Sequence, residues 1–442
     1  MHGIKLLRSL DAEMGCMMNS QQLLTFLTDG NVDEQLAALY GPSRIGFQRQ
    51  RYVDAIHAFV RQFGDSDQIA VFSAPGRTEL SGNHTDHNHG RVLAASIDLD
   101  VIAIAAPNGD GRIKVQSEGY PLDDVDLTDL TVQPQEKGTS ASLIRGMAAD
   151  IRERGESIGG FNAYTTSSVL KGSGLSSSAA FEVLIGTILN DFFCDQKMDA
   201  VSIAQSAQRA ENNYFGKPCG LMDQMACSVG GVIAIDFANP SAPVFERIDC
   251  DFTAQDIHLC IVDTGGNHAD LTPDYAAIPA EMKAAAAFFG KNVLRELPEA
   301  EFIGGIPRLR SRLGDRAVLR GLHFYAENRR VEEQTVALSL GDFDHFMRLV
   351  VESGRSSSNY LQNIYSPRNP EEQGLSLALC LAEDILAGAG AWRVHGGGFA
   401  GTILSFVPKA YLPRFVATME SVFGSRCCHV LSIRSEGGIR VV

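Results

Sequence analysis

A strand-like segment, a loop rich in glycine and serine, and a helix-like segment follow one another along residues 161–193. Residues 161–170 alternate apolar and polar side chains, and residues 179–193 carry apolar residues at helical spacing. The loop between them reads VLKGSGLSSSAA. The first backbone N–H groups of a helix have no partner within the helix, and its dipole is positive at that end, so an anion can bind there. This arrangement predicts a helix packed beside a sheet, with an anion-binding loop where they meet.

The loop also suits structural roles that need no ligand, and these stay open. A serine at the start of a helix also acts as an ordinary cap, and glycine allows a tight turn by itself. The loop lacks the lysine-serine or lysine-threonine pair of the P-loop, and it lacks the third glycine of the dinucleotide-binding fingerprint. If it binds phosphate, it belongs to another class of nucleotide-binding protein.

The length and charge of the chain limit its class and its partners. With 442 residues, 45% of them hydrophobic and 21% charged, we expect a soluble globular protein of two domains. The net charge of −15 argues against nucleic acid and anionic membranes as partners. No apolar run is long enough to cross a bilayer, and residues 1–18 do not resemble a signal peptide. The nine scattered cysteines form no C-x-x-C pair, which is typical of reduced thiols in the cytoplasm.

Local periodicity predicts helices and strands along the chain, with no internal repeat. We expect helices at residues 4–14, 20–39, 51–63, 140–154, 179–193, 201–214, 221–227, 279–297, 338–352 and 371–386. We expect strands at residues 69–73, 92–106, 112–117, 161–170, 232–237, 257–263, 402–407 and 429–432. Turns are expected at residues 74–77, at 109–111 in a hairpin, and at 240–243 between two domains. The apolar faces of the N-terminal helices are expected to pack on the body of the protein.

A polar segment at residues 75–90 is the second unusual feature. It contains His84, Asp86, His87 and His89, which are ligand types that zinc accepts. Their order matches no zinc motif such as H-E-x-x-H. Side chains that both donate and accept hydrogen bonds also suit the hydroxyls of a sugar. A zinc site, a sugar site and a solvated turn all stay open from this segment alone.

Two further segments carry candidate functional residues. Glu211 ends a predicted helix, and Asp223 follows a glycine-containing turn. Near a phosphate loop, such carboxylates suit a magnesium ligand and a base, but ordinary surface acidity explains them as well. Glycines at residues 396–398 precede a predicted strand, where the backbone can press against a ligand or simply connect two strands.

Together these segments resemble the GHMP kinases and, among them, the galactokinases. The resemblance rests on residues 76–77 with 82–86, 174–179, 218–224 and 396–399, and it extends from about residue 51 to the C-terminus. It implies an α+β fold of two domains, an N-terminal mixed sheet with helices and a C-terminal ferredoxin-like α/β sandwich, with the active site in the cleft between them. We divide the chain accordingly into a helical N-terminal extension at 1–50, an N-terminal kinase domain at 51–242 and a C-terminal kinase domain at 243–442.

The resemblance also implies an activity and a set of site residues. The expected enzyme transfers the γ-phosphoryl group of ATP to the C1 hydroxyl of galactose, with Mg2+, in the cytoplasm. By analogy Asp223 faces the hydroxyl as base or orienting group, Arg77 pairs with Asp223, and Ser178 and Glu211 hold magnesium. The sugar-contacting positions are Asn83, His84, Asp86, Gly220 and Tyr275. The ATP-binding positions are Lys171, Gly172, Ser173, Gly174, Leu175, Ser176, Ser177 and Ser178.

The chain departs from the usual galactokinase pattern at several positions. Most galactokinases have Glu in place of Asn83 and Tyr in place of His87, Thr is more usual than His395, and residues 171–173 depart from a plain glycine run. An amide accepts hydrogen bonds more weakly than a carboxylate and also donates them, so the sugar stays open between galactose, L-arabinose, galacturonate and N-acetylgalactosamine. A non-catalytic galactose and ATP sensor is the alternative function, although the serine-alanine residues that such relatives lose are intact at 177–180.

Overall fold

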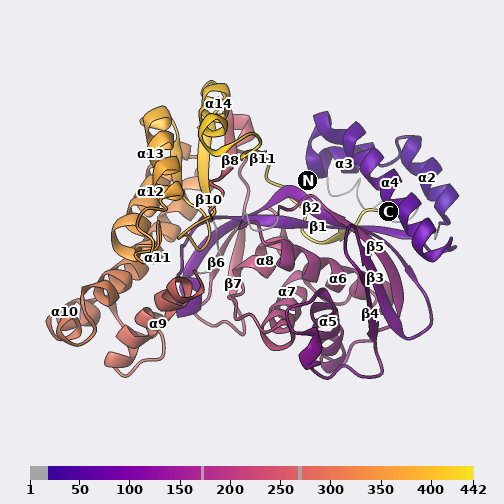
Figure 1. The fold of residues 1–442 in the computed structure, drawn as a ribbon, viewed down its shortest axis with the longest axis horizontal. Coiled ribbons are helices and arrows are strands. Elements are labelled where there is room, and N and C mark those ends of the chain that lie inside the picture. Colours follow the sequence, from indigo (N-terminus) through magenta and orange to yellow (C-terminus); the bar gives the residue numbers. More distant parts are fainter. Residues whose placement is uncertain (1–17, 171–173, 267–270) are drawn as a thin grey trace.

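The computed structural model describes residues 18–170, 174–266 and 271–442, and its first part is built on an eight-stranded sheet (Figure 1). The central strands, β1 (Ala70–Ser81) and β2 (Arg91–Pro107), pair antiparallel. The strand order is β12-β1-β2-β5-β3-β4, with β6 paired to β2 and β7 paired to β6. The other strands are β3 (Arg112–Ser117), β4 (Leu122–Asp126), β5 (Phe161–Ser167), β6 (Val232–Asp236), β7 (Val244–Ile248) and β12 (Ile439–Arg440).

Both faces of this sheet are covered, and β2 shows why. Val101 and Ala103 belong to one apolar core, whereas Ile102 and Ile104 belong to another, because successive side chains of a strand point to opposite faces. A strand covered on both faces needs apolar residues at nearly every position, which explains the long uninterrupted β-prone run. The first core includes the helices α5 (Ser140–Glu153), α6 (Ser177–Phe193) and α7 (Ala200–Arg209), and α8 (Met222–Val229) lies beside them (Figure 1).

The N-terminal helices cover the other face of the large sheet. They are α2 (Ser20–Thr28), α3 (Asp33–Tyr40) and α4 (Ile45–Phe63), with the short helix Pro42–Arg44 between the last two. Their apolar residues share one core with Val71, Ile102 and the C-terminal Val441. Figure 1 shows the C-terminus beside these helices. The expectation that the N-terminal helices pack on the body of the protein is therefore confirmed for the helices from Ser20 onward.

A four-stranded antiparallel sheet forms the second part, in the order β11-β8-β10-β9. Its strands are β8 (Ile257–Asp263), β9 (Ala391–Val394), β10 (Thr402–Pro408) and β11 (Cys428–Leu431). The long helices are α9 (Thr272–Phe288), α10 (Glu299–Leu313), α11 (Asp315–Ser339), α12 (Phe343–Ser356), α13 (Gly374–Leu386) and α14 (Leu412–Phe423). Short helical turns span Asp86–Asn88, Pro134–Glu136, Ala210–Phe215, Thr253–Gln255, Leu294–Glu296 and Ser357–Leu361.

Several local expectations are wrong. Residues 74–77 do not turn but continue β1, where a bulge between Pro75 and Arg77 shifts the register. The expected hairpin at residues 109–111 is absent as well, since β5 lies between β2 and β3 and runs parallel to β3. The helix expected at 279–297 is α9, which ends at Phe288, and the helix expected at 338–352 is divided between α11 and α12. The helix expected at 4–14 lies outside the described residues.

Sheet membership places two segments of the expected C-terminal domain in the large sheet. The strand β7 pairs with β6, and β12 pairs with β1. We therefore propose that the unit built on the large sheet extends through Ile248 and includes the C-terminal strand. Among the described helices, none combines the length and the apolar character that crossing a membrane requires. The described cysteines are free thiols.

Candidate active site

Arg77 and Asp223 form an ion pair between the large sheet and the helices that cover it. Arg77 projects from β1, and Asp223 lies in the first turn of α8. The Arg77 Nε donates to Asp223 Oδ1 at 2.8 Å, and Nη2 lies 2.8 Å from the same oxygen. Burial alone lowers the pKa of Arg77, but Asp223 more than offsets this, so the pKa is raised and the guanidinium stays charged. The pair holds a partly exposed carboxylate in one orientation.

The start of α6 lies directly against this pair. Gly174 and Ser176 have φ of +71° and +57°, and serine rarely adopts this left-handed conformation. The Arg77 Nη1 donates to the carbonyl of Gly174, and the Arg77 N–H donates to the carbonyl of Leu175 at 3.2 Å. Ser176, the N-cap residue, makes no capping bond to the helix; its Oγ donates instead to Asp223 Oδ2 at 2.5 Å. The predicted phosphate loop and the predicted catalytic residues are thus in contact.

The remaining predicted loop residues fall into two groups. Ser177 and Ser178 are the first residues of α6. Lys171, Gly172 and Ser173 lie outside the described residues.

Ser178 and Glu211 are brought together, as expected of magnesium ligands. The Ser178 Oγ donates to Glu211 Oε1 at 3.2 Å, and Gln224 Nε2 donates to Glu211 Oε2 at 2.9 Å. Gln224 also donates to Glu182 Oε2 at 3.2 Å. The ammonium of Lys217, a largely exposed side chain, lies 3.1 Å from Glu211 Oε1.

The chemistry of these groups fits a magnesium ion. Hydroxyl and carboxylate oxygens are the ligands that Mg2+ prefers. Burial raises the pKa of Glu182 well above its usual range, and the charge of Glu211 raises it further. The Glu182 Oε1 is buried and, among the described residues, has no hydrogen-bond partner. A cation at Ser178 and Glu211 would reduce the repulsion between these carboxylates.

The zinc interpretation of residues 84–89 finds no support. Within residues 18–170, 174–266 and 271–442, no three His, Cys, Asp or Glu side chains are grouped as a metal centre requires. His84 and His87 hydrogen-bond to each other and to neighbouring groups instead.

Asp86 and Gly220 are in direct contact. A Cβ on Gly220 would lie 1.8 Å from Asp86 Oδ2, so only glycine allows this approach. The other oxygen, Oδ1, accepts from the His87 N–H at 2.9 Å. Burial raises the pKa of Asp86 to about 6, and the charge of Asp223 contributes to that shift. Because Gly220 lies three positions before Asp223, the contact with Gly220 brings Asp86 close to the Arg77–Asp223 pair.

His84 connects the segment at residues 82–90 to the glycines at 396–398. Its Nε2 lies 3.0 Å from the carbonyl of Gly397, and its Nδ1 lies 3.3 Å from His87 Nε2. A carbonyl only accepts, so Nε2 carries the proton and Nδ1 accepts from His87. The His87 Nδ1 in turn accepts from Asn88 Nδ2 at 3.1 Å. Burial lowers the pKa of His84 to about 4, which keeps this chain of neutral rings intact at neutral pH.

Tyr275 lies on the same glycine segment from the other side. Its hydroxyl donates to the carbonyl of Gly398 at 2.8 Å, and its ring would be 2.5 Å from a Cβ on Gly397. The ring also packs edge-on against Phe399. His84 and Tyr275 are thus brought to the same loop, although 191 positions separate them in the sequence.

Asn83 is placed differently from the simple expectation of a sugar contact. It is 0% exposed. Its Nδ2 donates to Glu79 Oε1 at 3.0 Å and to the carbonyl of Gly396 at 2.7 Å. Its Oδ1 accepts from Asn363 Nδ2 at 2.8 Å and from Ser357 Oγ at 3.3 Å. The amide group is fully used inside the protein, although Asn83 lies within the expected sugar segment.

Sequence reasoning missed several residues of this site. Glu79 was not singled out, although a charged residue inside a strand buried along its whole length is an anomaly. Arg393, which is also fully buried, precedes the glycines and pairs with Glu79 Oε1 at 2.7 Å. Glu182 lies within α6 and carried no motif signal, because its helix is apolar on most sides.

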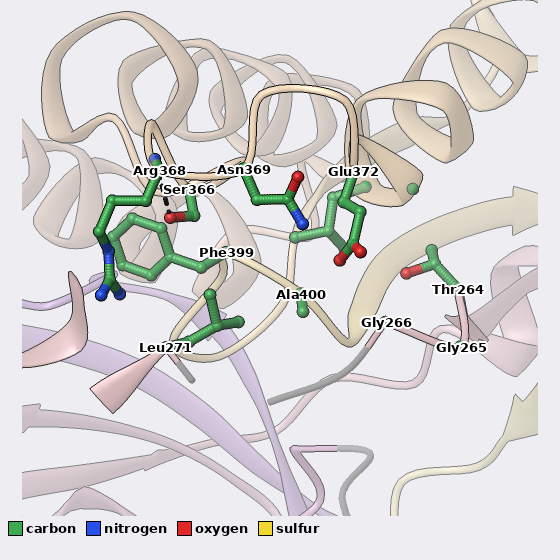
Figure 2. A pocket seen from close by; sticks show the side chains of 12 residues that line it. Thr264, Gly265, Gly266, Leu271, Ser366, Arg368, Asn369, Glu372, Phe399 and Ala400 are labelled. Atoms are coloured by element: carbon green, nitrogen blue, oxygen red, sulfur yellow. Dashed lines mark hydrogen bonds between the residues drawn. The ribbon is translucent and has the colours of Figure 1, made fainter. Parts of the chain in front are cut away.

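A cavity of about 640 Å3 lies beside the glycine segment (Figure 2). Its wall includes Thr264, Arg368, Asn369 and Glu372, and none of the predicted site residues that the structure describes lines it. Arg368 reaches Asp274, the neighbour of Tyr275, with Nη2 at 2.6 Å from Oδ2.

Comparison with known proteins shows the family to which this chain belongs. The galactokinase galactose-binding signature matches residues 57–107, and the GHMP kinases N terminal domain matches residues 142–231. The galactokinase of Streptomyces coelicolor is 30% identical over 370 residues, or 83% of this chain and 91% of that protein. The galactokinase of Bos taurus is 29% identical over 392 residues, or 87% of this chain and 95% of that protein.

Solved structures agree as well. Lactococcus lactis galactokinase complexed with galactose has a TM-score of 0.74 and 25% identity, over 87% of this chain and 98% of that one. A mevalonate kinase structure at 14% identity and a TM-score of 0.59, over 83% of this chain and 99% of that one, shares the fold alone. The fold is that of the GHMP kinases, which confirms the expected α+β class. Within that class, the chain belongs to the galactokinase family and is a sugar kinase that uses ATP.

Proposed function

We propose that this enzyme transfers the γ-phosphoryl group of ATP to the C1 hydroxyl of galactose in the cytoplasm, giving galactose 1-phosphate and ADP. The observation that carries the proposal is the contact between the Arg77–Asp223 pair and the start of α6. It joins a carboxylate that can face a hydroxyl to a helix N-terminus that can face phosphates.

Asp223 would orient the C1 hydroxyl toward the γ-phosphorus and accept its proton. Phosphoryl transfer proceeds through a loose transition state, so alignment and charge stabilisation matter more than early removal of the proton. Arg77 would fix the Asp223 carboxylate through Nε and Nη2 and would place positive charge beside the transferring group.

ATP would bind with its phosphates against the first turn of α6. The N–H groups of residues 176–178 belong to the end of a helix of 17 residues, where unpaired donors and the dipole favour an anion. Ser178 and Glu211 would hold Mg2+, which when bound neutralises charge on the phosphates. Lys217, whose ammonium touches Glu211, would move aside or contact a phosphate. Lys171, Gly172 and Ser173 complete the proposed ATP site.

The sugar would lie between the segment at residues 82–86, Gly220 and the glycines at 396–398. Asp86 would accept from sugar hydroxyls in ionised form, and the backbone of Gly220 leaves room beside it. His84 and Tyr275 would line the same space, with their polar atoms fixing the loop at Gly397 and Gly398. Asn83 belongs to this site by position, with its side chain directed inward.

A coupled assay of ADP release over galactose, L-arabinose, galacturonate and N-acetylgalactosamine tests the proposal. We expect ADP with galactose and Mg2+, and 31P spectra of a 1-phosphate ester. No ADP with any sugar, despite galactose and ATP binding, would identify a sensor. A strong preference for another sugar would identify that sugar as the substrate of the same phosphoryl transfer.

A further inference from the structure

The position at which most galactokinases have Glu is occupied by Asn83, whose amide is turned inward. Both of its polar atoms are bonded within the protein, and none of its surface is exposed. Asn83 therefore brings neither a charge nor a free polar group to a sugar. The question is whether another residue brings the charge.

Glu79 lies beside Asn83 and faces the site. Residues 77–79 pair with β2 in continuous register, so Arg77 and Glu79 point to the same face of β1. That face is the one on which Arg77 meets Asp223. The side chain of Glu79 is 5% exposed and is therefore largely buried; burial raises its pKa, and the charges of Arg393 and Arg77 oppose that increase.

Among the described residues, Oε1 of Glu79 accepts hydrogen bonds and Oε2 does not. Oε1 accepts from Arg393 Nη2 at 2.7 Å and from Asn83 Nδ2 at 3.0 Å. Oε2 accepts no hydrogen bond from any residue in the described part of the chain. A carboxylate has acceptor capacity on both oxygens, so Oε2 can accept from a ligand hydroxyl. The partner cation, Arg393, is 0% exposed and lies behind the carboxylate.

Negative groups outnumber positive ones in this space. Burial raises the pKa of Asp86, and the charges of Asp223 and Glu79 both add to the increase. Two cations oppose these three carboxylates: Arg77, whose Nε and Nη2 are engaged by Asp223, and Arg393, which pairs with Glu79 Oε1. A sugar with its own carboxylate would meet Glu79, Asp86 and Asp223 together.

We propose that Glu79 supplies the negative charge that a carboxylate at position 83 would otherwise bring to the sugar pocket, and that this charge selects neutral sugars over sugar acids. A neutral sugar offers a hydroxyl that donates to Oε2, whereas galacturonate brings a like charge into a poorly solvated space. Asn83 is a positioning residue, which fixes the Glu79 carboxylate and ties it to the carbonyl of Gly396. The inference rests on the proposed sugar kinase activity.

The test compares kcat/KM for galactose and for galacturonate in the wild type and in Glu79→Gln. The wild type should favour galactose by about tenfold or more, since one like-charge contact at low dielectric exceeds 1.4 kcal/mol. In Glu79→Gln we expect KM for galactose to rise and KM for ATP to stay unchanged. The ratio of kcat/KM for galacturonate to kcat/KM for galactose should rise about tenfold. An unchanged ratio in a folded variant with wild-type galactose kinetics would overturn the inference.

A matched control separates charge in the pocket from loss of a buried ion pair. Glu136→Gln removes a carboxylate from another largely buried arginine, Arg145, whose Nη2 lies 2.6 Å from Glu136 Oε1. It should reduce stability in the same manner and leave the sugar ratio unchanged. If both variants change the ratio alike, Glu79 has only a structural role.

A second measurement covers the case in which Glu79→Gln does not fold. In the wild type, the inhibition constant of galacturonate should exceed the dissociation constant of galactose by at least about tenfold. Equal affinities for the two sugars would contradict the inference. The exchange Glu79→Asn with Asn83→Glu keeps one carboxylate and one amide in contact, so it should retain the selectivity against galacturonate. The absence of ADP with every sugar would instead contradict the proposed function.

Discussion

At the scale of single residues, the charged side chains of Arg77 and Asp223 are held in one orientation by several hydrogen bonds each. Asp223 has one oxygen on Arg77 and the other on Ser176, so its position depends on two side chains from different elements. Arg77 also donates to the carbonyls of the loop before α6. Arg77, Asp223 and Ser176 therefore hold one another in position. Removing any of these side chains should disturb the positions proposed for both the sugar hydroxyl and the phosphates of ATP.

Asp223→Asn and Arg77→Ala should each reduce kcat by at least about 100-fold. The first removes the proton acceptor, and the second removes both the charge and the anchor of the carboxylate. Initial rates from the ADP assay measure the effect, and circular dichroism with a thermal melt shows whether the fold survives. Near-normal rates in either folded variant would refute its role.

Asp86 predicts how the use of the sugar depends on pH. Burial, with a contribution from Asp223, raises the pKa of Asp86 to about 6. Below that pH the carboxyl is protonated in the free enzyme and accepts hydrogen bonds poorly, so kcat/KM for the sugar should fall by about tenfold per pH unit. His84, whose pKa is lowered to about 4, stays neutral over this range and adds no step.

Kinetics from pH 5 to 8 at saturating MgATP test this expectation. The same titration of kcat/KM for ATP, at saturating sugar, should show no step near pH 6, because the Asp86 proton is then lost on binding the sugar. A flat sugar profile would mean that Asp86 is ionised throughout or does not touch the sugar.

Residue types near the site could be predicted from the sequence, but their contacts could not. The resemblance to galactokinases implied that Arg77 pairs with Asp223, and the structure brings the two together across 146 positions. The orientation of Asn83 depends on Gly396 and Asn363, which lie 313 and 280 positions away. Local sequence patterns carry no information about such distant partners. The sequence therefore suggested Asn83 as a sugar ligand, although its amide is directed inward.

At the scale of elements, helices and strands with strong periodicity were predictable, and their pairings were not. The segments that became α5, α6 and β8 follow their periodic runs closely. Residues 74–77 read as a turn because they contain proline and glycine, yet β1 passes through them with a bulge. A bulge changes where side chains point, and here it precedes Arg77. Proline and glycine correctly marked residues 74–77 as irregular, but the irregularity is a bulge within β1 and not a turn.

The turn before α8 supplies a prediction at this scale. Gly220→Ala should push Asp86 out of place, since the new Cβ would lie 1.8 Å from its Oδ2. We expect KM for galactose to rise by at least about tenfold, in keeping with one lost charged hydrogen bond, while KM for ATP changes little. Steady-state kinetics in both substrates measure the two effects separately.

Gly304→Ala is the matched control for this substitution. Gly304 lies within α10, and no atom lies within 4 Å of the position that its Cβ would take. It should leave both KM values unchanged and, if anything, stabilise the helix slightly. Unchanged galactose kinetics in Gly220→Ala would show that Asp86 can move without affecting the sugar.

At the scale of the whole molecule, the N-terminal helices, the large sheet and the C-terminal segment share one buried charge network. Asp100 of β2 is 0% exposed. It accepts from the Tyr40 hydroxyl at 2.5 Å and from Arg51 Nη1 at 2.6 Å, and Arg434 Nη1 lies 3.3 Å away. Tyr40 belongs to α3, Arg51 to α4, and Arg434 precedes β12. The packing of the N-terminal helices was predictable from their apolar faces. The buried charge of Asp100, which these helices surround together with the sheet, was not predictable from the sequence.

Tyr40→Phe should therefore destabilise the protein without changing its kinetics. The variant keeps the ring but removes a donor from a buried carboxylate, and it leaves the Tyr52 hydroxyl, 2.7 Å away, without that partner. Arg51 and Arg434 remain, so we expect a loss of about 1–3 kcal/mol in the free energy of unfolding. Urea denaturation measures it as a lower midpoint, and Tyr411→Phe, at a tyrosine that is 37% exposed, is the control that should not shift. If Tyr40→Phe unfolds at the wild-type midpoint, the network does not hold the extension to the sheet, and its apolar contacts alone must do so.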